Sequence, residues 1–146
     1  MLNTILYLLL ISNFFNQILV EPKVDVALQV TNIRNNEGIL KVAIFYDDES
    51  FQSEETAEYI ILDKSNAENG VLNATIQLPV GECGLSSLDD ENENDKMDYN
   101  WMGIPQEGYG FSDFEHTGWS KPHYEDFKIE IHPAGNQTIK MKMRYL

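Results

Sequence analysis

Cysteine and basic charge are both scarce in this sequence. Its single cysteine, Cys83, excludes an intramolecular disulfide, and no cysteine follows the N-terminal apolar stretch to accept a lipid. Ten basic residues stand against 24 acidic ones, which gives a net charge of −14. A field of this sign repels phosphate backbones and anionic lipid surfaces. We therefore expect no nucleic-acid partner and no peripheral membrane binding.

Catalytic motifs are absent as well. The sequence contains no Gly-x-Ser-x-Gly, His-Glu-x-x-His or phosphate-loop motif. Its three histidines, at positions 116, 123 and 132, lack the spacing of metal ligands. These absences favour a non-catalytic protein. The alternative is a small extracellular hydrolase that uses carboxylate and histidine residues of segment 103–126, such as Glu107, Glu115 or His116.

The N-terminus predicts export from the cytoplasm. Residues 1–20 contain an apolar stretch of signal-peptide length, and the polar break Glu21-Pro22-Lys23 follows. Polar amide side chains interrupt this segment, which falls short of the roughly 20 apolar residues that a bilayer crossing needs. We predict a signal peptide at 1–20 and one domain at 21–146, secreted to an extracellular or periplasmic space. An uncleaved anchor and a buried N-terminal element are the alternatives.

Apolar and polar residues alternate along most of the remaining chain, which is typical of half-buried strands. Turn-rich segments separate these stretches, and the only helix that we expect lies at 53–59. The predicted strands are 24–31, 39–46, 58–62, 71–78, 127–131 and 139–145, with a seventh at 83–88. The pattern predicts an all-β fold: a single antiparallel β-sandwich, immunoglobulin-like or transthyretin-like, with one long irregular loop at 89–126.

The long loop begins with four oxygen-bearing residues at the offsets of a calcium loop. They are Asp90, Asn92, Asn94 and Asp98. The twelfth position holds Trp101 in place of a glutamate, so the loop is no EF-hand, and Glu107 is the nearest candidate for a closing carboxylate. Hard oxygen donors favour calcium over zinc or copper. The missing twelfth ligand predicts a weak site, in the roughly 0.1–1 mM range of extracellular modules.

Charge crowding supports the calcium prediction. Six carboxylates lie within positions 89–98 against Lys96 alone, and a divalent cation would relieve their repulsion. Asp95 occupies the sixth position, where glycine is preferred, although aspartate tolerates a left-handed backbone. The alternative is a solvated acidic hairpin with no ion. We also expect Glu107 to contact this loop, as a ligand or through backbone amides, and Glu91 and Glu93 to point into water.

Aromatic residues and glycines crowd the second half of the long loop. Such rings can line a sugar or peptide groove, but they also pack as satellite clusters beneath long loops. We expect most of them to pack, because a long ordered loop needs apolar surface to bury. The candidates for a ligand-binding face are Trp101, Tyr109, Phe111 and Trp119.

The same region carries a family motif. The acidic run and the stretch Gly103-Ile-Pro-Gln-Glu107-Gly-Tyr-Gly-Phe111-Ser112 resemble an uncharacterised secreted family, domain of unknown function 2141, over residues 24–146. The second motif matches at every fixed position, whereas Asp95 replaces a usual glycine and Cys83 a frequent aromatic residue. The resemblance implies a small exported β-sandwich and no assigned reaction.

These features together predict a secreted, non-catalytic β-sandwich. Its long loop is ordered by calcium and presents a binding face. The expected partner is an extracellular glycan or protein.

Overall fold

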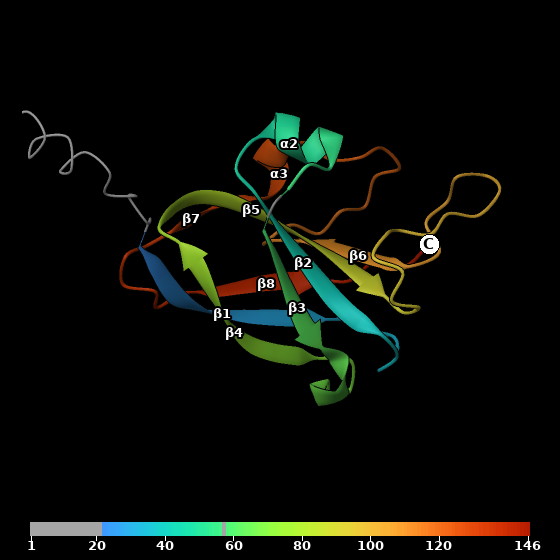
Figure 1. Cartoon of the computed structure of the whole chain (residues 1–146), viewed down its shortest axis with the longest axis horizontal. Helices are drawn as coiled ribbons and strands as arrows, with labels where there is room; N and C mark the ends of the chain where they lie inside the picture. The colour runs from blue at the N-terminus through green and yellow to red at the C-terminus, as the bar shows by residue number, and fades with distance from the viewer. Residues whose placement is uncertain (1–21, 57) are drawn as a thin grey trace, which may run out of the picture.

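The computed structural model describes residues 22–56 and 58–146, so the predicted signal peptide lies outside the described residues. Two sheets pack face to face, as Figure 1 shows. The three-stranded sheet has the order β4 (Leu72–Pro79), β1 (Lys23–Thr31), β8 (Thr138–Lys142). The five-stranded sheet has the order β3 (Tyr59–Asp63), β2 (Ile39–Phe45), β5 (Gly81–Asp90), β6 (Gly108–Phe111), and β7 (Lys128–Ile131) also pairs with β5. The predicted all-β sandwich is confirmed.

The core lies between the sheets and follows the alternation of the strands. Val26, Leu28 and Val30 of β1 are buried against inward-facing residues of the other sheet, such as Val42 and Leu85. Burial of each such side chain contributes about 1.5–3 kcal/mol. Because the chain has a single cysteine, this core carries the stability that a disulfide supplies in many small domains.

One pair of strands within the described residues runs parallel. The first strand, β1, pairs in parallel with the last, β8, from Ala27 opposite Thr138 to Thr31 opposite Lys142. The other ladders between named strands are antiparallel. Local alternation shows that a segment is a strand but not which neighbour it takes, so the parallel pair was not predicted.

Strand β5 positions the two segments that matter for function. It pairs with β2 from residue 84 to 90, with β7 through its first half and with β6 through its second half. The connection 91–107 therefore leaves the end of β5 and returns to its side, and the connection 112–123 leaves β6 across the same sheet. Both parts of the predicted long loop are thus tied to one strand.

The helices are short, and the predicted helix at 53–59 is wrong in position. Helix α2 spans Asp48–Ser53, because Asp47 caps it by accepting a 2.7 Å hydrogen bond from the Ser50 amide. Its C-cap, Glu54, has a left-handed φ of 59°, which ends the helix where it was expected to begin. Among residues 22–56 and 58–146, the other helices are the 3-10 helix η1 (Lys64–Asn66) and α3 (Tyr124–Phe127). No helix in the described part of the chain is long and apolar enough to cross a membrane.

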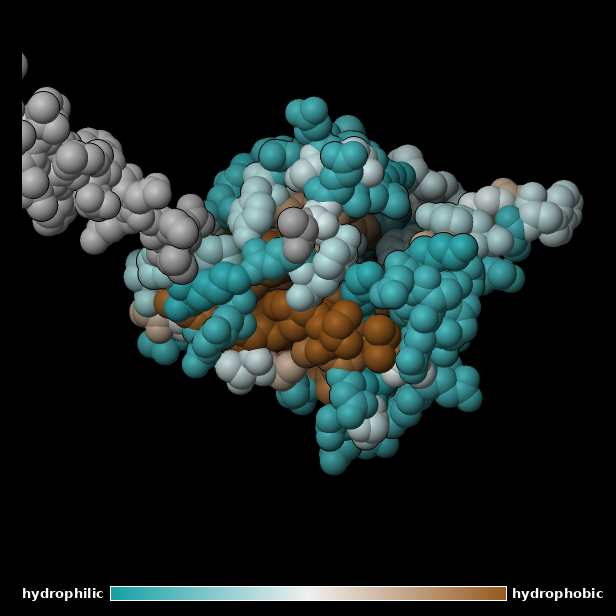
Figure 2. All heavy atoms as spheres, in the orientation of Figure 1, coloured by the Kyte–Doolittle hydropathy of each residue, from teal (hydrophilic) through white to brown (hydrophobic). Residues whose placement is uncertain are grey.

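A second apolar cluster covers the outer face of the five-stranded sheet beneath α2 and α3. It consists of Phe45, Phe51, Phe111, Tyr124 and Phe127. Gly84 makes room for it, since a Cβ there would lie 2.6 Å from the Phe127 ring. Figure 2 shows hydrophilic side chains over the top of the molecule and apolar side chains gathered around β3, where Ile61 is exposed. The expectation that most loop aromatics pack is therefore confirmed for this cluster.

Candidate functional site

The acidic loop (residues 90–98) is organised around the carboxylate of Asp90. Asp90 is fully buried at the end of β5, and its two oxygens accept hydrogen bonds from the backbone amides of Asn94 (3.0 Å) and Asp95 (2.8 Å). Asp95 takes a left-handed φ of 67°, and Glu93 one of 57°. The aspartate at the sixth position thus adopts the backbone conformation that usually favours glycine.

Two asparagine side chains in this loop converge on Asp98. The amide of Asn92 donates a 2.6 Å hydrogen bond to Asp98, and that of Asn94 donates to both Asp98 oxygens at 3.1 and 3.0 Å. The side-chain oxygens of the two asparagines accept from the backbone amides of Asn94 and Lys96. The four predicted ligands therefore form one hydrogen-bonded network.

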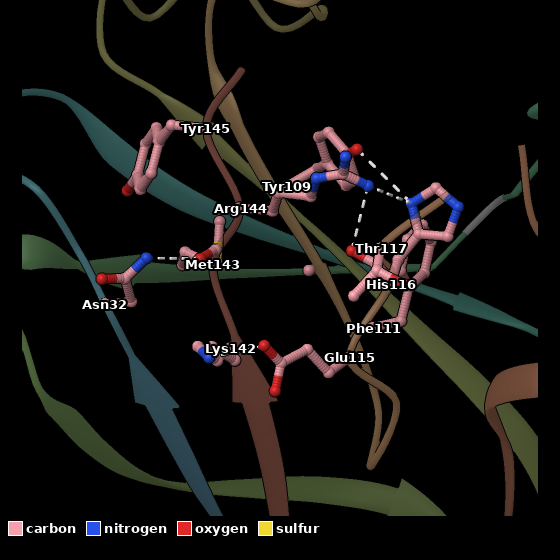
Figure 3. A pocket seen from close by; sticks show the side chains of 11 residues that line it. Asn32, Tyr109, Phe111, Glu115, His116, Thr117, Lys142, Met143, Arg144 and Tyr145 are labelled. Atoms are coloured by element: carbon pink, nitrogen blue, oxygen red, sulfur yellow. Dashed lines mark hydrogen bonds and ion pairs between the residues drawn. The ribbon is translucent and has the colours of Figure 1, made fainter. Parts of the chain in front are cut away.

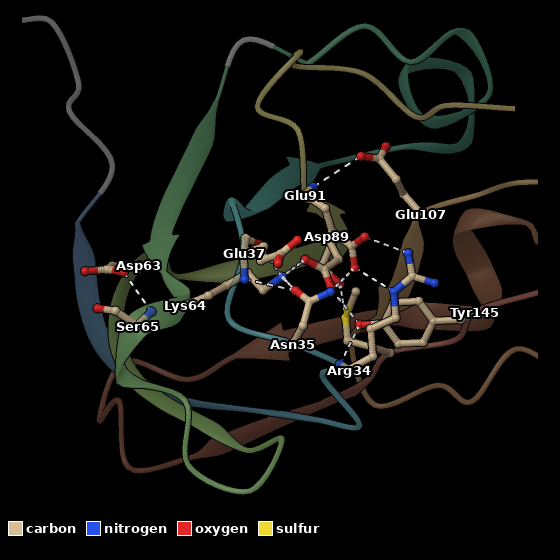
Figure 4. Close-up of polar contacts among 12 residues, drawn as sticks. Arg34, Asn35, Glu37, Asp63, Lys64, Ser65, Asp89, Glu91, Glu107 and Tyr145 are labelled. Carbon is tan, nitrogen blue, oxygen red and sulfur yellow. Dashed lines mark hydrogen bonds and ion pairs between the residues drawn. The ribbon is translucent and has the colours of Figure 1, made fainter.

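Glu107 joins this network from the start of β6, as expected. Its carboxylate accepts hydrogen bonds from the backbone amides of Glu91 (3.2 Å) and Asp98 (3.1 Å), and Figure 4 shows the first of these contacts. Only 4% of Glu107 is exposed, and burial raises the pKa of its carboxyl group. Glu107 therefore bridges the two ends of the acidic loop.

The expectation that Glu91 points into water is wrong. Arg34 donates two hydrogen bonds to its carboxylate, at 2.6 and 2.7 Å, and Asn35 donates a third at 2.8 Å. The hydrogen bond from Arg34 is the main cause that lowers the Glu91 pKa. Glu93 is exposed, as expected. The β1–β2 connection thus holds the acidic loop through a bidentate ion pair.

The network contains donors of the type that calcium takes, held together by hydrogen bonds. Carboxylate and amide oxygens suit calcium better than they suit soft metals. Within residues 22–56 and 58–146, however, no group of three or more His, Cys, Asp or Glu side chains is placed to hold a metal ion. The amide nitrogens of Asn92 and Asn94 face Asp98, so a cation between these side chains requires both amides to turn. Calcium binding stays a prediction.

A groove of about 460 Å³ lies beside the acidic loop, on the outer face of the five-stranded sheet. Its floor includes Ala43, Ser86 and Leu88 from adjacent strands. One wall comes from segment 91–107 and the other from segment 112–123. The wall residues include Met97, Tyr99, Pro105, Trp119, Lys121 and Pro122. Both halves of the long loop thus shape one concave site, the sheet groove.

Three of the four residues predicted for a binding face line the sheet groove. They are Tyr109, Phe111 and Trp119. Trp119 is 84% exposed. Trp101 is 91% exposed and does not line the groove, although Tyr99 and Gly103 beside it do. Tyr59 and Tyr99, at 46% and 56% exposure, complete the aromatic rim. The sequence places Tyr59 in an alternating strand, but alternation alone does not show that a groove lies beside this side chain.

The family of this chain follows from comparison of its sequence with protein-family models. A family model described as "Uncharacterized protein conserved in bacteria (DUF2141)" matches residues 28–140. The chain belongs to this family. A search of curated proteins and a search of solved structures each found no match. The acidic loop and both walls of the sheet groove lie within the matched residues, and of the residues that line the groove only Leu146 lies outside them.

A second cavity of about 250 Å³ in the DUF2141 domain holds two residues of the hydrolase alternative (Figure 3). His116 Nδ1 lies 3.4 Å from the Tyr109 hydroxyl and 3.3 Å from Arg144, and Glu115 pairs with Lys142. Glu107 instead accepts from loop amides. Each of the three residues named for hydrolysis therefore has a partner that holds it in the fold.

Proposed function

We propose that this DUF2141 domain is a secreted, non-catalytic glycan-binding module whose sheet groove takes the sugar. The exposed rings of Tyr59, Tyr99 and Trp119 around one concave surface carry the proposal. An aromatic ring offers a flat apolar face that packs on the carbon-bearing face of a sugar ring. Exposed rings in this arrangement are costly to leave in water, and a ligand that covers them recovers that free energy.

The polar lining of the sheet groove suits a sugar better than an apolar ligand. Ser86 and Thr56 carry hydroxyl groups, and Lys96 and Lys121 carry ammonium groups, among the groove residues. The groove volume of about 460 Å³ lies within the range of small-molecule sites, roughly 300–1,000 Å³. A concave site of this size accommodates a few sugar units, whereas protein partners usually need a larger and flatter surface.

The acidic loop links the proposed calcium site to the groove. Asp95, Lys96 and Met97 line the groove while belonging to the same loop as the predicted ligands. Calcium bound at Asp98 and its asparagine neighbours would fix this wall before the sugar arrives, which lowers the ordering cost of binding. Weak sites of this type suit extracellular calcium concentrations, and the predicted signal peptide at 1–20 supports export.

Matched tryptophan variants test the proposal. Glycan-array screening with and without calcium, followed by calorimetry on the best hit, is expected to show binding that calcium strengthens. Trp119→Ala lowers the affinity roughly tenfold, equivalent to ~1.4 kcal/mol, because it removes a ring from the groove. Trp101→Ala is the control, since this ring is at least as exposed but does not line the groove. No glycan hit, or equal losses in the two variants, would reject glycan binding at this site.

A further inference from the structure

A fully buried lysine lies between the two sheets' connections and does not line the sheet groove. Lys64 begins η1 directly after β3, and its side chain has no exposed surface. Its ammonium group donates to the Glu37 carbonyl at 2.6 Å, to Asn35 Oδ1 at 3.1 Å and to Asp89 Oδ1. Figure 4 shows these three acceptors around the Nζ atom. The lysine is thus held in one position by contacts on three sides.

The carboxylate partner is equally buried. Asp89 lies on β5, has no exposed surface, and points into the space between the sheets. Its second oxygen, Oδ2, accepts a 2.6 Å hydrogen bond from the hydroxyl group of Tyr145. The carboxyl group of Asp89 therefore has an amine on one oxygen and a phenol on the other.

Burial of this ion pair carries a large desolvation penalty. Both charges have left water, and the mutual attraction of a buried pair often fails to compensate for that loss. Transfer of one proton from Lys64 to Asp89 removes both charges and leaves a neutral amine beside a neutral carboxylic acid. A desolvated lysine amine is a nucleophile, and the two reacting groups are already in contact.

We propose that Lys64 and Asp89 join in an intramolecular isopeptide bond. Lys64 Nζ attacks Asp89 Cγ, the Nζ–Cγ bond forms, and the Cγ–Oδ2 bond breaks. The departing oxygen leaves as water with two of the three protons of the original ammonium group, and the third stays on the amide nitrogen. The reaction needs no oxidant and no other reactant. Tyr145 donates a hydrogen bond to the oxygen that leaves, and it therefore acts as a positioning residue.

The bond would replace two buried charges by one neutral amide. It would also close a loop between positions 25 residues apart and tie the end of the edge strand β3 to the central strand β5. Cross-links of this kind restrict the unfolded chain as a disulfide does. The single cysteine of this chain cannot form such an internal link with another cysteine.

A tryptic digest of the denatured full-length protein tests the bond directly. Trypsin does not cut after an acylated lysine, so residues 42–96 are expected in one peptide that is lighter by one water molecule. Fragment ions should place the link between Lys64 and Asp89. Cleavage after Lys64 shows that its amine is free and overturns the proposal. This holds even where the peptide with Asp89 has lost water, because an aspartate can dehydrate without forming a link. A peptide that has lost ammonia and is linked to Asn35 overturns it as well.

Variants identify the groups that react. Lys64→Arg abolishes the water loss, because a guanidinium group stays protonated and does not acylate under these conditions. Lys41→Arg, on an exposed ion pair with Asp95, is the matched control and keeps the link. Tyr145→Phe retains the ring and lowers the linked fraction in freshly made protein, whereas an unchanged fraction overturns its positioning role. The wild-type digest decides the bond even where a buried variant fails to fold.

Discussion

Two glutamates at the base of the acidic loop have pKa values displaced in opposite directions. Arg34 lowers the pKa of Glu91 through a bidentate hydrogen bond, while burial raises the pKa of Glu107. Ionised Glu91 therefore stabilises the folded state. For Glu107, burial raises the pKa, while the hydrogen bonds from two backbone amides act in the opposite direction. The two residues hold the same loop by different physical means, which separate experiments can distinguish.

The Arg34–Glu91 pair predicts a pH-dependent stability effect. Arg34→Met is expected to cost about 1 kcal/mol at neutral pH, a modest value because solvent screens the pair. The folded pKa of Glu91 lies below its ordinary value of 4.5, so the contribution is present above that value and is lost as pH falls through the folded pKa. Urea unfolding well above and well below this pH measures it. A cost that does not change with pH would contradict the ion-pair explanation.

Removal of Glu107 is expected to loosen both ends of the acidic loop together. Glu107→Ala leaves two backbone amides without an acceptor, and each unsatisfied amide costs about 1–3 kcal/mol unless water reaches it. Hydrogen exchange should become faster from Glu91 to Asp98. Glu93→Ala, at an exposed position, is the control and should leave exchange unchanged. Changes limited to the neighbours of position 107 would show that the loop does not depend on this carboxylate.

At the scale of elements, β6 is shaped by glycines that face inward. A Cβ at Gly108 would lie 2.3 Å from the Tyr145 ring, so Gly108→Ala forces that ring aside. We expect a loss of about 1–3 kcal/mol, the usual cost of overpacking, in thermal or urea unfolding. Gly118→Ala is the control, because its Cβ would meet only the flexible His116 side chain at 3.2 Å. Equal losses in the two variants would mean that glycine flexibility, rather than contact with Tyr145, explains the effect.

The sequence predicted the elements that depend on local pattern. The alternation of Val26, Leu28 and Val30 identified β1. The residues chosen by their oxygen spacing lie in one hydrogen-bonded network, while their role as calcium ligands stays a prediction. The sequence pattern missed β6 because glycine at alternate positions resembles a loop, although the space is filled by Tyr145 and other side chains of a distant segment. The parallel β1–β8 pair, the Arg34–Glu91 contact and the groove rim all join distant parts of the chain, which local pattern does not report.

At the scale of the whole molecule, calcium is expected to stabilise the fold of this strongly acidic chain. At 100 times its dissociation constant, a ligand that binds only the folded state adds about 2.7 kcal/mol. Melting temperatures in chelator and in excess calcium measure this effect. Asp98→Asn should reduce the stabilisation by calcium, because it removes the charge on which Asn92 and Asn94 converge. Glu93→Gln should leave that stabilisation unchanged. An unchanged melting temperature would exclude the calcium site.

The parallel pairing of the first and last strands also determines how the domain responds to mechanical force. Tension applied to the two chain ends pulls β1 from its N-terminal end and β8 from its C-terminal end, in opposite directions along a shared ladder. The ladder from Ala27–Thr138 to Thr31–Lys142 is then loaded in shear, so its hydrogen bonds must break together rather than one after another. A domain stretched between two anchors would therefore hold its shape until a single abrupt rupture, which single-molecule pulling would record as one high-force event.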